Sequence, residues 1–264
     1  MLKQNASFAH FTNMNDITKI YDYIHSGSTE KLCMLGAMLR NADLGEVELI
    51  EADLSGSDFS FADLEYADLS KSILEGALFF RANLRSATLK NCIMKGANLS
   101  KAILKKADLR GSDLSEADLS YANISDAFLS FSKLINANLE YSNLSHSNLS
   151  GADLTKAKTE GILLYGAILK GAILYKVDFS GKDLSRGNFQ GAVMKCAKLH
   201  GADLSGADLS YSDLEGADLR GANLTGAYLR NSNLNHANLQ HANLSESVIT
   251  GANFKGSNLS HAIF

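Results

Sequence analysis

The chain has 264 residues, of which 45% are hydrophobic and 20% are charged, and its formal net charge is −4. It contains no Pro or Trp, and its three Cys are too few and too widely spaced to predict a disulfide framework or a zinc site. No run of about 18 apolar residues is present, so we expect no membrane-spanning helix. Residues 1–5 lead into no apolar segment, so we also expect no secretory signal, and a reducing cytoplasm is the default compartment.

The first predicted element is a short helix within residues 1–34, a segment that we treat as an N-terminal helical cap. Residues 13–16 offer N-cap candidates and Gly27 can end the helix; between them the apolar residues at helical spacing are Ile17, Ile20, Tyr21 and Ile24. An open end of a repeat structure invites edge pairing, so we expect this apolar stripe to cover the first coil of the region that follows. A helix that binds a partner is the alternative.

From Leu35 to Phe264 the chain is one uninterrupted five-residue repeat. Its 46 pentads follow the pattern of a small residue, then any residue, then a large apolar one, and at the large position only Thr159 breaks it. The small residue is Ala or Ser in 40 pentads, and the large one is Leu in 35. This period fits neither a helix nor a long strand, so it predicts a solenoid in which two inward side chains alternate with a corner.

The repeat has the consensus A-(D/N)-L-x-x, as in Ala117-Asp118-Leu119 and Ala222-Asn223-Leu224. In this it resembles the pentapeptide-repeat protein family, over about 230 of the 264 residues. The resemblance implies an all-β solenoid, a right-handed quadrilateral β-helix with four pentads in each coil. Stacking then places residue n over residue n+20, gives roughly 11–12 coils at strand spacing, and buries continuous ladders of Leu and Ala.

The charged residues are arranged in alternating bands along the repeat. Residues 71–110 carry nine basic side chains, and the preceding residues 41–70 carry no Lys or Arg. The candidate acidic band consists of Asp43, Glu46, Glu48, Glu51, Asp53, Asp58, Asp63, Glu65 and Asp68. Many of these acids occupy the consensus Asp position, which favours a solvated surface; a binding role is the alternative.

One group of outward residues recurs every 20 positions and mixes aromatic with basic side chains. This candidate partner-binding column consists of Phe61, Arg81, Lys101, Tyr121 and Tyr141, with Phe80 beside it. Stacked aromatic rings next to cations can bind a peptide, a nucleobase or an acidic protein surface. A ladder that only stabilises adjacent coils is the alternative, and we favour it.

The repeat is irregular at residues 157–189. Thr159 occupies a Leu position, and both Ile162 and Lys182 occupy Ala positions, 20 residues apart, so the two faults should stack. Because an inward Lys is costly unless its ammonium reaches water, we expect local bulging or a lysine that extends to solvent. A hinge or a docking notch is the alternative to tolerated drift.

The repeat continues to the last residue, so the final coil is expected to expose apolar side chains and unpaired backbone groups. We therefore expect a homodimer through the C-terminal coils, with Phe254, Leu259 and Phe264 at the contact. His241 and His261 should be neighbours one coil apart, and we interpret them as solvated ladder residues rather than metal ligands.

No phosphate loop, nucleophile elbow or zincin motif is present, and we expect no enzyme activity, metal or cofactor. We favour a rod-like scaffold that binds a protein partner along its faces, as the resemblance implies for regulators of cyanobacterial cell differentiation. The alternative is a DNA mimic that binds DNA gyrase, as the resemblance implies for quinolone-resistance members. Direct nucleic-acid binding is not expected, because acidic bands interrupt the basic ones.

Overall fold

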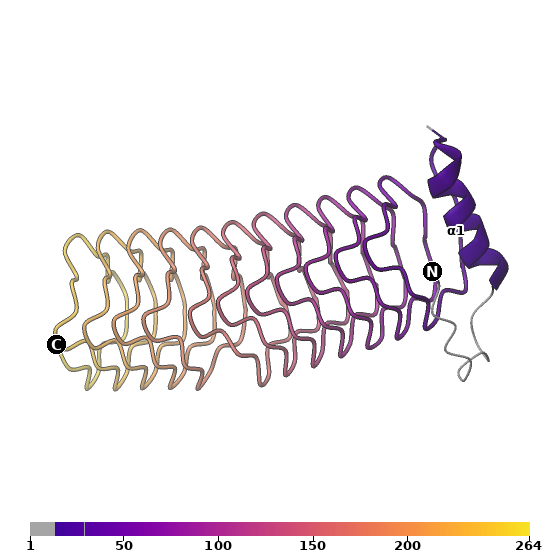
Figure 1. Ribbon diagram of the computed structural model, residues 1–264. Coiled ribbons are helices and arrows are strands. Elements are labelled where there is room, and N and C mark those ends of the chain that lie inside the picture. The colour runs from indigo at the N-terminus through magenta and orange to yellow at the C-terminus, as the bar shows by residue number, and fades with distance from the viewer. Residues whose placement is uncertain (1–13, 29) are drawn as a thin grey trace.

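The protein is a straight rod of stacked coils with one helix across its N-terminal end, as Figure 1 shows. We describe it from a computed structural model, and the structure describes residues 14–28 and 30–264. The N-cap candidate Asn13 and the residues in which a secretory signal was sought lie outside the described residues.

Every coil is 20 residues long, because parallel β-bridges join residue i to residue i+20. These bridges run from Cys33 paired with Asp53 to Asn243 paired with Ile263. The resulting fold is a β-helix solenoid, as predicted. Among the residues that the structure describes, however, the bridges are isolated and form no extended strand, because a corner follows each short extended segment. Handedness and the number of coils stay predictions.

The coil turns its corners with residues in the left-handed conformation. Backbone φ is positive at nearly every described residue whose number ends in 1 or 6, from Gly36 (φ 63°) to His261 (φ 60°). None of the non-glycine residues in this conformation is Val, Ile or Thr, since β-branched side chains tolerate positive φ worst. The side chains of these corner residues project from the four edges of the rod.

The consensus Asp or Asn has a direct structural role next to each corner. Its Oδ1 atom accepts a hydrogen bond from the backbone N–H two residues later, as in Asp118 with Ser120 (3.0 Å) and Asn148 with Ser150 (3.0 Å). This is an Asx turn, which bends the chain locally without help from other coils. Sequence reasoning assigned the consensus Asp to a solvated surface and did not identify this bond.

The interior is filled by the two inward ladders. The Leu ladder is almost wholly buried, and Phe59 and Phe79 stack inside it with ring centroids 4.9 Å apart. Where Ser replaces Ala, the buried hydroxyl donates to a backbone carbonyl, as Ser112 does to Leu109 (2.6 Å). These buried hydroxyl groups are therefore satisfied.

Helix α1 (Met14–Ser26) covers the first coil. Its Ile20 side chain is fully buried in the core of the rod, and the carboxylate of Asp16 accepts a hydrogen bond from Met38 N (3.0 Å). In later coils the equivalent N–H donates to the preceding coil, as Asp58 does to Ala37. The helix therefore replaces the missing coil in both packing and hydrogen bonding, and Gly27 follows its last residue with φ 62°. The interpretation of residues 1–34 as a cap stays a prediction.

Candidate protein-binding surface

The aromatic and basic residues predicted to form a column do lie along one edge of the rod. The rings of Tyr121 and Tyr141 stack with centroids 5.0 Å apart and planes 11° from parallel. Phe61 and Phe80 meet edge to face at 5.4 Å. The exposed fractions of Phe61, Tyr121 and Tyr141 are 37%, 56% and 47%, so the column is a ladder and is also open to a partner.

The two cations of the column lie between aromatic rings. The Arg81 guanidinium lies 5.9 Å from the Phe61 ring centroid and 5.4 Å from that of Phe80. The Lys101 ammonium lies 5.8 Å from both the Phe80 and the Tyr121 centroids. Within residues 14–28 and 30–264, neither cation has an ion pair with a carboxylate, although both are exposed. Their charges are positioned by the rings but not neutralised.

The column ends at Gly161. The Tyr141 hydroxyl donates to the Glu160 carboxylate (2.6 Å), and this hydrogen bond raises the pKa of Tyr141 above its ordinary value. A side chain at Gly161, whose φ is 63°, would collide with the Tyr141 ring. The ring therefore rests on the glycine, and the corner positions of the next coils, Gly181 and Gly201, carry no side chain.

The predicted acidic band is divided among the four faces rather than gathered on one. Asp43, Glu46, Asp63 and Glu65 line a shallow depression of about 340 Å³. Glu51 instead binds Lys71 (3.0 Å) and Lys31 (3.4 Å), and the hydrogen bonds from these lysines lower the pKa of Glu51. Ion pairs also join Arg40 to Asp58 and Arg85 to Glu65. The negative charge of the band is therefore partly neutralised by neighbouring Lys and Arg side chains.

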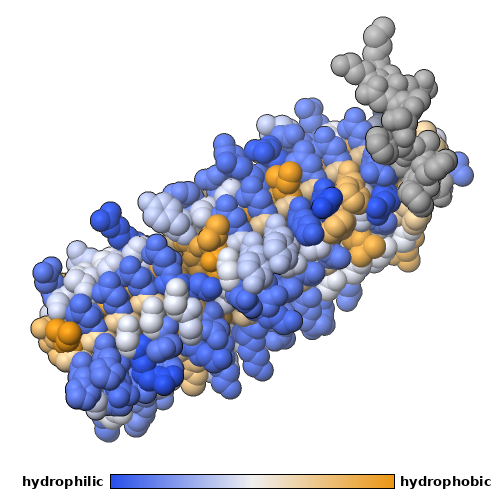
Figure 2. Space-filling view, turned by 90° about the horizontal axis from the view of Figure 1, so that it is seen from below, coloured by the Kyte–Doolittle hydropathy of each residue, from blue (hydrophilic) through white to orange (hydrophobic). Residues whose placement is uncertain are grey.

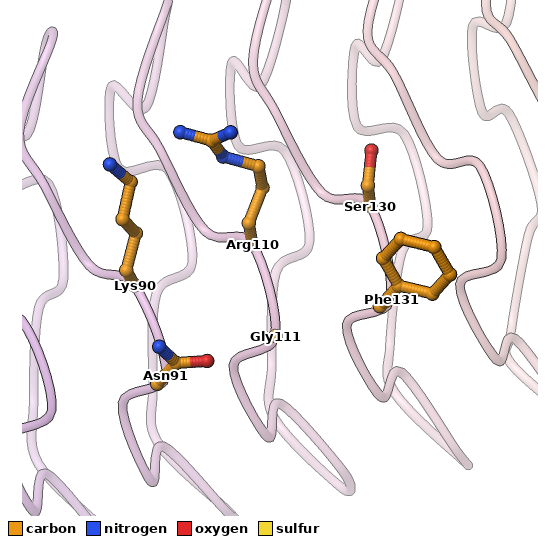
Figure 3. A pocket seen from close by; sticks show the side chains of 6 residues that line it. All are labelled: Lys90, Asn91, Arg110, Gly111, Ser130 and Phe131. Atoms are coloured by element: carbon orange, nitrogen blue, oxygen red, sulfur yellow. The ribbon is translucent and has the colours of Figure 1, made fainter.

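A basic groove on the diagonally opposite edge was missed by sequence reasoning. It has a volume of about 380 Å³ and is lined by Lys90, Asn91, Arg110, Gly111, Ser130 and Phe131, as Figure 3 shows. Both of its cations pair with Asp108, at 3.2 Å for Lys90 and 2.6 Å for Arg110. Unlike the cations of the column, they already have a carboxylate partner. The sequence does carry a sign of this groove, because Gly111 lies between the longer corner residues Asn91 and Phe131 on the same edge.

The irregular region also interrupts the backbone ladder, which the sequence did not predict. No backbone hydrogen bond joins residues 157–166 to residues 177–187, a stretch that the structure describes in full. Ile162 is buried at its Ala position, while Lys182 is only half-buried, so its side chain reaches solvent. Thr159 is buried and its hydroxyl donates to the Asp178 carbonyl. Figure 1 shows a wider space between coils on one side of the rod in this salmon-coloured stretch.

The last coil exposes apolar side chains. Leu259 and Phe264 are 37% and 59% exposed, and the rings of Phe254 and Phe264 meet edge to face at 6.4 Å. Figure 2 shows such apolar side chains as separate patches on a largely hydrophilic surface. The homodimer that we predict through this end is not tested by the structure of one chain.

The remaining predicted groups have ordinary surroundings. Cys92 is buried at an Ala position, its Sγ lies 2.9 Å from the Leu69 carbonyl oxygen, and burial raises its pKa to about 12. His241 and His261 stack at 4.9 Å. In the part of the chain that the structure describes, no group of three or more His, Cys, Asp or Glu could hold a metal ion. No described helix has the length and apolar character needed to cross a membrane.

Comparisons with known proteins agree on the repeat. The family model described as "Pentapeptide repeats" matches in eight copies between residues 37 and 264. No curated protein sequence matches the chain significantly.

Solved structures of two repeat proteins are similar to the chain. HetL, involved in heterocyst differentiation regulation in the cyanobacterium Nostoc sp. strain PCC 7120, is 31% identical over 92% of this chain and 97% of its own, with a TM-score of 0.33. Full-length QnrB1, a plasmid-mediated fluoroquinolone resistance protein, is 20% identical over 80% of this chain and 91% of its own, with a TM-score of 0.42.

Proposed function

Because the chain belongs to the pentapeptide repeat family, we propose that it is a non-enzymatic, rod-like scaffold that binds a protein partner along its solenoid faces. The contact surface is the column, namely Phe61, Phe80, Arg81, Lys101, Tyr121 and Tyr141. One observation carries this proposal: Arg81 and Lys101 lie exposed between aromatic rings and have no carboxylate partner in the described chain.

This arrangement suits an acidic protein surface. A flexible surface Lys loses side-chain entropy when it forms an ion pair, which is why most exposed pairs contribute little. Here the rings of Phe80 and Tyr121 already restrict the Lys101 ammonium, so part of that loss precedes binding. Exposed tyrosines and an arginine are also the residue types that dominate protein interfaces.

The test is a pull-down from the native host with three forms of the protein. The first is the wild type, and the second combines Phe61→Ala, Tyr121→Ala and Tyr141→Ala. The third is a control that removes exposed aromatic rings from the diagonally opposite edge, Phe131→Ala and Tyr211→Ala. We expect a partner that the wild type and the control retain and the column variant loses. Retention by the column variant would contradict the proposal.

A DNA mimic that binds DNA gyrase is the second candidate. The depression with Asp43, Glu46 and Asp63 favours it, because these carboxylates have no ion pair in the described chain. The ion pairs of Glu51, Asp58 and Glu65 weaken it. A gyrase supercoiling assay separates the two candidates: inhibition or drug protection would favour the mimic, and no effect at high protein concentration would leave the scaffold.

We propose two further properties of the scaffold. The exposed Leu259 and Phe264 side chains support a homodimer through the C-terminal coils, and sedimentation of the wild type and a Phe264→Asp variant tests it. Cys33, Cys92 and Cys196 are free thiols, which favours a reducing cytoplasm.

A further inference from the structure

We propose that the interrupted stretch between residues 157–166 and 177–187 is a docking site for an extended polypeptide segment of a partner protein. The segment joins the rod by strand addition, with its backbone hydrogen bonded to the coils on either side. This inference does not depend on the column, because it concerns backbone groups rather than the aromatic edge.

The first argument is the set of unpaired backbone donors. In the preceding coil four N–H groups donate to the next coil; they belong to Leu139, Tyr141, Leu144 and His146. Their equivalents one coil later have no backbone acceptor within the described residues; they belong to Thr159, Gly161, Leu164 and Gly166. Unpaired donors in a row are the pattern that an added strand satisfies.

The second argument is the facing set of acceptors. The carbonyls of Ser180, Asp183 and Ser185 occupy the positions that would accept these bonds in a regular coil, and no backbone N–H donates to them. In the next coil along, the carbonyls at the equivalent positions of His200, Asp203 and Ser205 are all paired. The fourth carbonyl of the facing set, that of Asp178, already accepts a hydrogen bond from the Thr159 hydroxyl. Three donors, at Gly161, Leu164 and Gly166, and the three facing acceptors therefore match the two sides of a single parallel strand.

The third argument is that core side chains hold the interruption open. Ile162 and Lys182 replace two Ala residues that would stack 20 positions apart on one face; Ile162 is buried and adds volume inside the wall, while Lys182 extends to solvent. Thr159 replaces a Leu that would bridge the two coils from inside, and Gly187 removes a methyl group. Interiors pack too densely to absorb such changes without displacing the backbone.

The fourth argument concerns the space and its charge. A cleft of about 410 Å³ lies at this point, lined by Glu140, Ala157, Lys158, Thr159, Glu160, Asp178, Ser180 and Lys182. Its rim carries both signs of charge, which suits a polypeptide and disfavours a nucleic acid, whose phosphates would face three carboxylates. A helix satisfies its own backbone, so only an extended segment uses these donors and acceptors.

The chain itself supplies a probe. Residues 217–226 lie on the same two faces as residues 177–186, two coils later in the rod. There they donate four hydrogen bonds to the following coil and accept four from the preceding one. We would measure binding of a fluorescent peptide with this sequence to the full-length protein. The matched control is the same peptide with N-methyl groups on the amides of Gly221 and Leu224, which keeps the side chains and removes the donors that face the Ser180 and Asp183 carbonyls.

The second control changes the protein instead of the peptide. This repaired protein carries Thr159→Leu, Ile162→Ala and Lys182→Ala, which together restore the repeat and should close the interruption without unfolding the rod. We expect saturable binding of the peptide to the wild type and at least about tenfold weaker binding of the N-methylated peptide. We expect similarly weak binding to the repaired protein, and slower hydrogen exchange at Gly161 and Leu164 when the peptide is bound.

Three binding results would overturn the proposal. They are no saturable binding at millimolar peptide, equal affinity of the two peptides, and equal affinity of the wild type and the repaired protein. Equal hydrogen-exchange protection of Gly161 and Tyr141 in the free protein would also overturn it, because the coils would then be paired in solution.

Discussion

The regular coils and the interrupted stretch differ by only a few inward residues, yet their backbones differ sharply. In residues 97–106 the small ladder positions hold Ala, and N–H groups such as those of Leu99 and Leu104 donate to the next coil. In residues 157–166 the small positions hold Ala157 and Ile162, and no backbone bond reaches the following coil.

The comparison associates the open ladder with the combined departures at Thr159, Ile162 and Lys182, since Val177 at a small position still accepts from Lys198 N (2.9 Å). A solenoid coil contacts only its neighbours, so one fault is not averaged over a large core. Four predictions follow this comparison from the largest expected effect to the smallest.

Introducing the Ile162 and Lys182 side chains at the equivalent positions of a regular coil should open that coil. Ala102→Ile with Ala122→Lys places the same residues one coil apart on the same face, and we expect a loss of about 4 kcal/mol in the free energy of unfolding from overpacking and lysine burial. Urea unfolding measures it. Glu75→Ile is the control, because it places an Ile over the existing Lys95 on the outside, where a change within about 0.5 kcal/mol is expected. Equal losses in both would contradict the role of inward volume.

Repairing the fault should have the opposite effect. Thr159→Leu, Ile162→Ala and Lys182→Ala together should raise the free energy of unfolding by about 2 kcal/mol, since a buried Leu returns and the coils can pair. The same urea measurement applies. A less stable variant would mean that the interruption is already the best packing of this stretch.

Thiol reactivity compares the two regions at matched positions. Cys92 occupies a small ladder site of a regular coil, and with its pKa raised to about 12 it should resist a disulfide reagent at pH 8. Ala157→Cys, in a background with Cys33→Ser and Cys196→Ser, places a thiol at the equivalent site beside the cleft. We expect it to react about 100-fold faster than Cys92. Equal rates would indicate that the cleft is closed in solution.

The smallest effect concerns the ion pairs that join regular coils. Burial opposes ionisation of Asp108, but hydrogen bonds from Arg110 and Lys90 outweigh it and lower the pKa of Asp108. The lowered pKa stabilises the fold above the ordinary aspartate pKa, and this contribution is lost as pH falls through the folded pKa. Asp108→Asn should therefore cost at most about 1 kcal/mol at pH 7 and nothing at pH 2. Urea unfolding at both values checks it, and a cost that persists at pH 2 would contradict the charge argument.

Much of the surface was predictable because the register never shifts. Counting by 20 placed Tyr121 over Tyr141 and His241 over His261, and the structure stacks both pairs. Counting could not show that Phe80, one residue from the corner, turns its ring toward Lys101. It also missed the groove at Gly111, since side-chain direction across neighbouring coils depends on rotamers.

By itself the sequence determined the five-residue period, the inward ladders and the position of the fault at Thr159, Ile162 and Lys182, because side-chain size and polarity repeat in strict order. Only the tertiary structure decided what the fault does. Whether a coil yields by moving a side chain or by losing its hydrogen bonds depends on how the neighbouring coils pack. Here Lys182 reached solvent and the backbone ladder opened as well.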